Sequence, residues 1–138
     1  MNLFISYAEE DANRIAPVCQ ALASWGLSYW TPPRGTMGAE QNAQIQRALP
    51  GTNAFLRICT SYTSRSYWMT FEQTALLALQ AEEYRQTGRR TRMLINVILD
   101  KAYRRQPFDY ADPVVEATDL QSETWREALR ALLFNPVQ

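Results

Sequence analysis

Five short apolar runs alternate along the chain with segments in which apolar residues recur at helical spacing. The runs are close to continuously apolar, which is typical of strands covered on both faces. Strands joined by helix-length connections imply right-handed crossovers and therefore a parallel sheet. The predicted strands are residues 3–7, 27–30, 54–59, 93–99 and 113–117, the last of them a short edge strand.

Helical segments fill the intervals between these strands. The first begins near Asp11, a favourable N-cap, and ends at Gly26, but Pro17 inside it predicts a displaced or irregular first turn. The remaining helices are predicted over residues 45–49, 66–85 and 123–134. No repeat or linker interrupts this alternation. The pattern therefore predicts one α/β domain over residues 1–138, with helices on both faces of a five-stranded parallel sheet.

Composition narrows the classes of partner and compartment. Fourteen basic and fourteen acidic residues cancel, so no overall field attracts nucleic acid or an anionic membrane. The arginine-containing stretches 89–92 and 104–105 are short and are interpreted as solvated loops. No apolar stretch approaches the length that spans a bilayer, and nothing near Met1 resembles a signal peptide. We expect a soluble cytoplasmic protein that binds neither nucleic acid nor membrane.

The chain contains no histidine. This absence excludes Ser-His-Asp and Cys-His catalysis and removes the commonest metal ligand. Its two cysteines, Cys19 and Cys59, show no metal or redox spacing and are interpreted as small core residues in a reducing compartment. No metal site is expected.

One acidic residue falls on the apolar side of the helix predicted over residues 66–85. At about 100° per residue, Glu72 shares an arc with apolar residues, and an ionised carboxylate there is costly unless it is paired. It either reaches water at the rim of the sheet and binds a neighbouring loop, or has a functional role. The helix begins just beyond the carboxyl end of a strand, where open parallel sheets bind ligands, and this favours function. The apolar arc holds Trp68, Phe71, Ala75, Leu76 and Leu79, and the polar side holds Thr70, Gln73 and Gln80.

Several segments, in this order and spacing, resemble a bacterial-type TIR (Toll/interleukin-1 receptor) domain. Residues 3–7 and the acidic cluster after them resemble the first strand and loop of the family, and residues 26–30 its second strand. Residues 32–38 fall where the family has its BB loop, and 61–72 resemble its third helix with the motif W-x-x-x-E. The resemblance implies a flavodoxin-like three-layer sandwich.

In NAD-cleaving members of that family the glutamate of this motif is the catalytic residue, and it corresponds to Glu72. The resemblance implies that NAD is the substrate and that no cofactor is needed. A carboxylate beside the ribose would stabilise an oxocarbenium-like centre while cationic nicotinamide departs. It further implies that Tyr7 and Ala8 border the nicotinamide end, that Arg34 reaches a phosphate and that Trp68 forms a wall of the pocket.

Some residues depart from the family pattern. Thr31-Pro32-Pro33 stands where many members have an acidic residue, and Ala8-Glu9-Glu10 replaces basic residues of some catalytic members. Arg57 lies inside an apolar strand, where we interpret it only as an edge or partner contact.

The leading hypothesis is an NAD glycohydrolase that yields nicotinamide with ADP-ribose or a cyclic ADP-ribose signal. By resemblance it would act in bacterial anti-phage immunity, where another protein senses the product. A different class, a non-catalytic adaptor that assembles with other TIR domains, remains open, and self-association suits both. A third alternative is a nucleoside deoxyribosyltransferase-like enzyme, which shares a similar sheet and also uses a glutamate.

Overall fold

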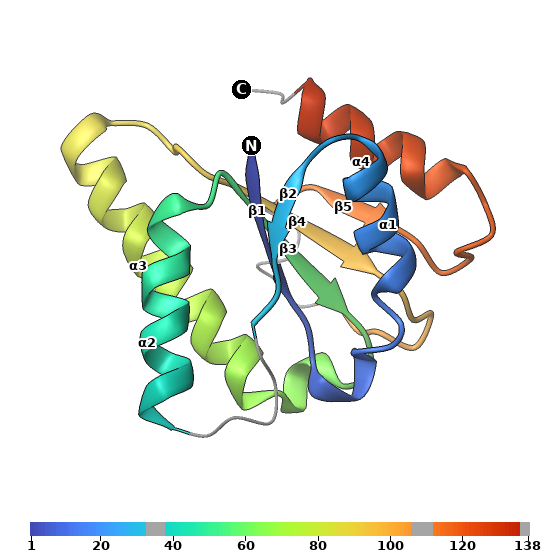
Figure 1. Ribbon diagram of the computed structural model, residues 1–138, viewed down its shortest axis with the longest axis horizontal. Coiled ribbons are helices and arrows are strands. Elements are labelled where there is room, and N and C mark those ends of the chain that lie inside the picture. Colours follow the sequence, from blue (N-terminus) through green and yellow to red (C-terminus); the bar gives the residue numbers. More distant parts are fainter. Residues whose placement is uncertain (33–37, 106–111, 136–138) are drawn as a thin grey trace.

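The computed structural model describes residues 1–32, 38–105 and 112–135, which form one parallel sheet with helices on both sides (Figure 1). All neighbouring strand pairs are parallel, and the strand order is β2-β1-β3-β4-β5. The predicted five-stranded parallel sheet is confirmed, including a short edge strand at the end of the order. The strands are β1 (Asn2–Ser6), β2 (Ser28–Trp30), β3 (Ala54–Cys59), β4 (Met93–Ile98) and β5 (Val114–Glu116).

Helices cover the two faces of the sheet in pairs. In Figure 1, α1 and α4 lie on one side of the strands, and α2 and α3 lie on the other. Within the described residues, short 3₁₀ turns at Glu9–Asp11, Leu49–Gly51 and Thr63–Arg65 connect these elements. The result is a three-layer sandwich. The helices are α1 (Ala16–Ser24), α2 (Ala39–Ala48), α3 (Tyr67–Thr87) and α4 (Thr124–Phe134).

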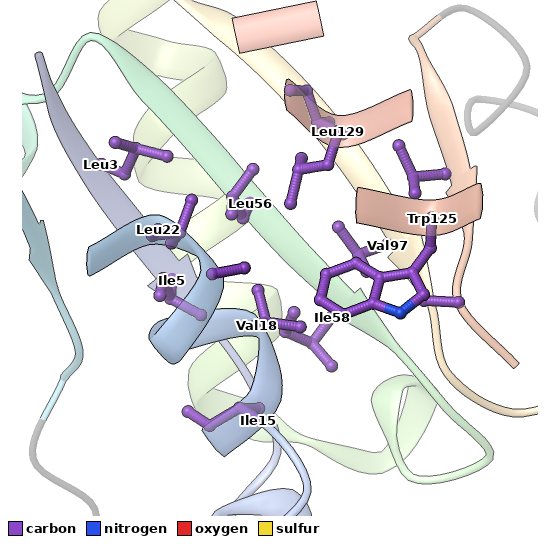
Figure 2. Close-up of a cluster of buried hydrophobic side chains, with 14 of the residues drawn as sticks. Leu3, Ile5, Ile15, Val18, Leu22, Leu56, Ile58, Val97, Trp125 and Leu129 are labelled. Atoms are coloured by element: carbon purple, nitrogen blue, oxygen red, sulfur yellow. The ribbon is translucent and has the colours of Figure 1, made fainter. Parts of the chain in front are cut away.

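Two apolar clusters fill the space between the layers. Successive strand residues point to opposite faces, so Leu3 and Ile5 join the cluster under α1 and α4, whereas Phe4 joins the cluster under α2 and α3. Figure 2 shows the first cluster, in which Trp125 and Leu129 of α4 meet β3 and β4 beside the side chains of α1. The central strand β3 is buried along its whole length, as its continuous apolar run predicted.

Two helices begin elsewhere than predicted. The first starts at Ala16, with Pro17 in its first turn, so the proline displaces the start as one alternative anticipated. Asp11 is not its cap but a buried residue of the preceding 3₁₀ turn. Helix α2 is twice as long as the predicted segment 45–49. Its first half escaped notice because its residues are mostly polar, so little apolar periodicity marks it.

Helix α3 follows its predicted bounds closely. The Ser66 side chain caps its first turn by accepting a hydrogen bond from the Met69 amide, and Gly88 ends it in a left-handed conformation. The placement of Gln80 on the polar side was wrong, because it is buried and donates to the backbone carbonyl of Arg92. Of the cysteines, Cys59 is buried and Cys19 is half-buried against the core.

Within the part of the chain that the structure describes, no helix combines the length and apolarity needed to cross a bilayer.

Candidate functional site

A row of three polar residues crosses the sheet on the side of α2 and α3. In the strand register Ser6 of β1 lies beside Arg57 of β3, which in turn lies beside Asn96 of β4. Each stands two residues beyond an apolar residue of the α2/α3 cluster, so the row replaces the apolar core toward the carboxyl ends of the strands. All three side chains are buried. We call Ser6, Arg57 and Asn96 the polar row.

Glu72, on α3, contacts the polar row through Ser6. Its side chain has 0% exposure, and its Oε1 accepts a hydrogen bond of 2.7 Å from the Ser6 hydroxyl. Local sequence explains its place, because the Ser66 cap fixes the start of α3 and Glu72 then falls on the buried side of its second turn. The expectation that Glu72 reaches water was wrong, because its side chain is completely buried. It is a buried carboxylate held by a strand residue, at the edge where parallel sheets bind ligands.

Arg57 places a positive charge in the same buried layer. It lies on the central strand and is 6% exposed, so the interpretation as an edge or partner contact was also wrong. Its Nη1 donates to the Tyr103 hydroxyl at 3.0 Å, and lies 3.4 Å from both Asn96 Oδ1 and Cys59 Sγ. The guanidinium is therefore surrounded by polar atoms from two strands and from the loop that follows β4.

A hydrogen bond ties the loop that follows β1 to the residues that follow β2. Tyr7 packs its ring in the α1/α4 cluster, and its hydroxyl donates to the Pro32 carbonyl at 3.1 Å. Ala8 has 0% exposure and directly precedes the 3₁₀ turn. The ring of Tyr7 thus packs on the opposite side of the sheet from Glu72, although both belong to the same edge. Arg34, the predicted phosphate contact, lies outside the described residues.

Aromatic residues of α3 contact one another in the turn that precedes Glu72. Trp68, one turn before Glu72, contacts Phe71 with a centroid distance of 5.5 Å and an interplanar angle of 81°. Tyr67 contacts Trp68 in the same edge-to-face manner and is itself 72% exposed. Trp68 is only partly buried against the α2/α3 cluster, so it extends from the core toward the surface beside Glu72.

A cavity of about 310 Å³ lies at the opposite edge of the sheet, around the start of β4 and the end of α3. Its charged lining groups are bonded to each other and to backbone. Arg92 donates to the carbonyls of Leu49, Pro50 and Thr52 and pairs with Glu83 at 2.7 Å. The hydrogen bond from Arg92 lowers the pKa of the Glu83 carboxyl below its usual value, with a smaller contribution from Thr91. We interpret this arrangement as a structural clasp and place the candidate site at the polar row.

Sequence reasoning reached only part of this site. It singled out Glu72 and Trp68, which the structure places one helical turn apart, but it gave no role to Ser6, Asn96 or Tyr103. A sequence feature was available for Asn96, the one polar residue inside the most apolar run of the chain. For metals, the described residues contain no cluster of three or more Cys, Asp or Glu side chains suited to a metal ion.

The strand order, the helices on both faces and the buried carboxylate beside the end of β1 define a flavodoxin-type α/β protein with a TIR-like arrangement. The family described as TIR domain matches residues 3–133, and the chain belongs to that family. Among solved structures, the chain is similar to the TIR domain of the Toll-related receptor TRR-2 from Hydra magnipapillata, with a TM-score of 0.69 and 14% identity over 95% of this chain and 97% of that one. At that identity the likeness extends to the fold alone. A comparison with curated proteins finds no match.

Proposed function

We propose that this TIR domain cleaves the bond between nicotinamide and ribose in NAD, with Glu72 as its catalytic carboxylate. The observation that carries the proposal is a completely buried carboxylate at the ligand-binding edge of a parallel sheet, held by Ser6. A buried charge is costly to keep, and such groups concentrate at functional sites. Glu72 also occupies the glutamate position of the W-x-x-x-E motif in a chain that belongs to the family.

The chemistry suits a site that has one carboxylate and no histidine. Nicotinamide is already cationic when bound to ribose, so its departure needs no general acid. Positive charge then develops on the ribose, and a fixed carboxylate stabilises that charge in a buried environment more strongly than it would in water. The C–N bond breaks with its electron pair on nicotinamide, and water or an adenine nitrogen completes the reaction. The products are nicotinamide with ADP-ribose or with a cyclic ADP-ribose.

The remaining site residues are assigned by the same proposal. Trp68 forms a wall beside Glu72, since its partly exposed ring lies one turn away on α3. Tyr7 and Ala8 border the nicotinamide end from the loop after β1, and Arg34 contacts a phosphate of the dinucleotide. The biological setting that we propose is bacterial anti-phage defence, in which a second protein senses the product.

The decisive experiment compares NAD consumption by the purified protein and by Glu72→Gln, with the products separated by chromatography. The amide keeps the shape of the side chain and removes the charge, so we expect turnover to fall on the order of 100-fold or more. Glu82→Gln is the matched control, because Glu82 lies on the same helix with a half-exposed side chain paired to Arg85. That variant should turn over NAD as the wild type does.

Equal turnover by the wild type and Glu72→Gln would refute the catalytic role. The identity of the second product distinguishes hydrolysis from cyclisation. Complete inactivity of the wild type at high concentration would favour the alternative function described next.

The alternative is a scaffold that signals by assembling with other TIR domains, and one surface favours it. Leu77 and Tyr84 of α3 are 49% and 57% exposed, and their seven-residue spacing places them on the same side of the helix. Paired exposed apolar side chains of this kind are typical of protein contact surfaces. Light scattering would test the alternative: the wild type should assemble with rising concentration, and Leu77→Ser with Tyr84→Ser should not.

A further inference from the structure

The strand order has its switch point between β1 and β3. The chain leaves β1 to form β2 on one side, and β3 lies on the other side of β1. Open parallel sheets bind ligands at such a point, beside the loops that follow the two strands. Glu72 belongs to this region, because it is bonded to Ser6, the last residue of β1.

A buried aspartate joins the loops on the two sides of the switch point. Asp11 lies in the 3₁₀ turn after β1 and has 0% exposure. Its Oδ2 accepts a hydrogen bond of 2.6 Å from the hydroxyl of Thr60, a buried residue that directly follows β3. The two residues are 49 positions apart in the sequence, and the pairing of β1 with β3 brings them together.

The second carboxylate oxygen of Asp11 extends this connection to β4. Its Oδ1 accepts a hydrogen bond from Arg14 Nη1 at 3.0 Å, and Arg14 Nη2 donates to the backbone carbonyl of Leu99 at 3.3 Å. Leu99 directly follows β4. A buried carboxylate is costly unless it is paired and hydrogen-bonded, and these contacts meet both needs while they join the carboxyl ends of three adjacent strands. We call Asp11, Arg14 and Thr60 the loop tie.

Each end of the loop tie leads to a part of the proposed site. On the β1 side, the Asp11 amide donates to the Ala8 carbonyl at 2.9 Å. On the β3 side, the Thr60 amide donates to the hydroxyl of Thr63, which begins the 3₁₀ turn before α3, at 2.8 Å. The tie therefore links the loop proposed to border nicotinamide to the start of the helix that carries the proposed catalytic carboxylate.

We propose that Asp11 is a positioning residue, which holds the loop after β1 against the start of α3 and thereby aligns bound NAD with Glu72. Its catalytic meaning rests on the proposed function. Alignment of reacting groups lowers the barrier, and a misplacement of about 1 Å can cost roughly 100-fold in rate. Loss of the tie should lower kcat far more than it raises KM, because misalignment weakens the transition state more than substrate binding.

The test compares Thr60→Val with Thr60→Ser. Valine keeps the approximate shape of threonine and removes the hydroxyl that bonds Asp11, whereas serine retains a hydroxyl. In Thr60→Val we expect hydrogen exchange of the Asp11 amide, followed by NMR, to accelerate about 10-fold, because the turn loses a hydrogen bond to a buried charge. We also expect kcat for NAD to fall about 10-fold or more, with KM within about twofold of the wild type. Thr60→Ser should keep wild-type values in both measurements.

Thr52→Val is the matched control. It removes another buried threonine hydroxyl, which donates to the Ala48 carbonyl at 3.1 Å at the opposite end of the strands. This variant should unfold at a lower temperature but keep the wild-type exchange rate at Asp11 and the wild-type kcat. A general loss of stability would accelerate exchange in both valine variants alike, so the contrast isolates the loop.

Wild-type exchange at the Asp11 amide in Thr60→Val would overturn the proposal, whether or not the protein cleaves NAD. Equal acceleration in Thr52→Val would overturn it as well. In an active protein, a loosened turn with an unchanged kcat would refute the positioning role. A wild type that releases no nicotinamide would instead refute the proposed function, and the exchange contrast would still decide whether the tie holds the loop.

A second variant covers the case in which Thr60→Val does not fold. Arg14→Met alters a side chain that is 40% exposed, and it removes the hydrogen bonds to Asp11 and to the Leu99 carbonyl. Exchange at the Asp11 amide should accelerate in this variant too. Arg126→Met is the control, because Arg126 on α4 is similarly exposed and also pairs with an acidic residue three positions away. The same exchange rate at Asp11 in both methionine variants would overturn the proposal.

Discussion

At the residue scale, the site depends on a side chain of two heavy atoms. Ser6 follows three apolar residues at the end of β1, and its hydroxyl donates a hydrogen bond to the buried Glu72 carboxylate. A larger apolar residue at this position would bury more apolar surface, but it would remove this hydrogen bond from the carboxylate. Serine therefore makes less apolar contact, but it forms a charge-assisted hydrogen bond, which is stronger than a neutral one.

Replacing Ser6 with alanine should consequently destabilise the protein more than its size suggests. The variant loses a hydrogen bond to a buried charged group, so we expect the free energy of unfolding to fall by about 1.5–3 kcal/mol. Urea denaturation measures this, and NAD turnover should fall with it if Glu72 is catalytic. Ser28→Ala, at an exposed position of β2, is the matched control and should change the stability little. Equal effects of the two substitutions would contradict the argument.

Residue identities in the site were predictable to different degrees. Helical spacing alone placed Glu72 on the buried side of its helix, because the period of an α-helix is fixed. The contact with Ser6 was not predictable, because it joins positions 66 residues apart through a strand-to-helix packing that no local pattern encodes. The same holds for Arg57 and Asn96, whose contact requires the register of β3 and β4.

At the element scale, α3 runs from the candidate site, at the carboxyl ends of the strands, to the amino ends of the strands. Its first turns carry Trp68 and Glu72, and its last turns carry Glu83, which pairs with Arg92 at the start of β4. Gly88 ends the helix with φ 74°, a left-handed conformation that other residues adopt only at a cost. The position of this end decides whether the chain can turn back into β4.

We therefore expect Gly88→Ala to destabilise the protein by about 1–2 kcal/mol, through backbone strain alone. A methyl group added at Gly88 meets no atom within 4 Å, so a steric clash does not contribute. Gly51→Ala is the matched control, since it is equally open but lacks a positive φ. It should be neutral or slightly stabilising, because alanine restricts the unfolded chain. Thermal unfolding of both variants measures the contrast, and a destabilised Gly51→Ala with a neutral Gly88→Ala would refute it.

At the scale of the whole molecule, the amino ends and the carboxyl ends of the strands carry different features. The amino-terminal edge is closed by the clasp of Arg92, which ties the end of α2, the start of β4 and α3 together. The carboxyl-terminal edge carries the polar row and Glu72. The clasp and the candidate site therefore lie at opposite ends of the strands. Substitutions in the clasp should change stability without changing the contacts of the site.

This separation predicts a pH effect on stability that leaves the site intact. The folded pKa of Glu83 is depressed by the hydrogen bond from Arg92, so its contribution to stability is present above the unfolded pKa of about 4.3 and is lost as the pH falls through the folded value. Glu83→Gln should therefore be less stable than the wild type at pH 7, and the gap should narrow toward pH 3. Urea midpoints at both pH values test this, and a gap that is constant with pH would contradict it.

The sequence by itself determined the alternation of strands and helices, the parallel sheet and the buried side of α3. These follow from continuous apolar runs of strand length, from the helical period of 3.6 residues and from the handedness of crossovers, which act on any chain with this pattern. The tertiary structure alone decided that β3 is central, that Arg57 is therefore buried, and that Ser6 holds Glu72. The physical reason is that burial and pairing of charges depend on which strands become neighbours. That choice is made by packing across the whole sheet.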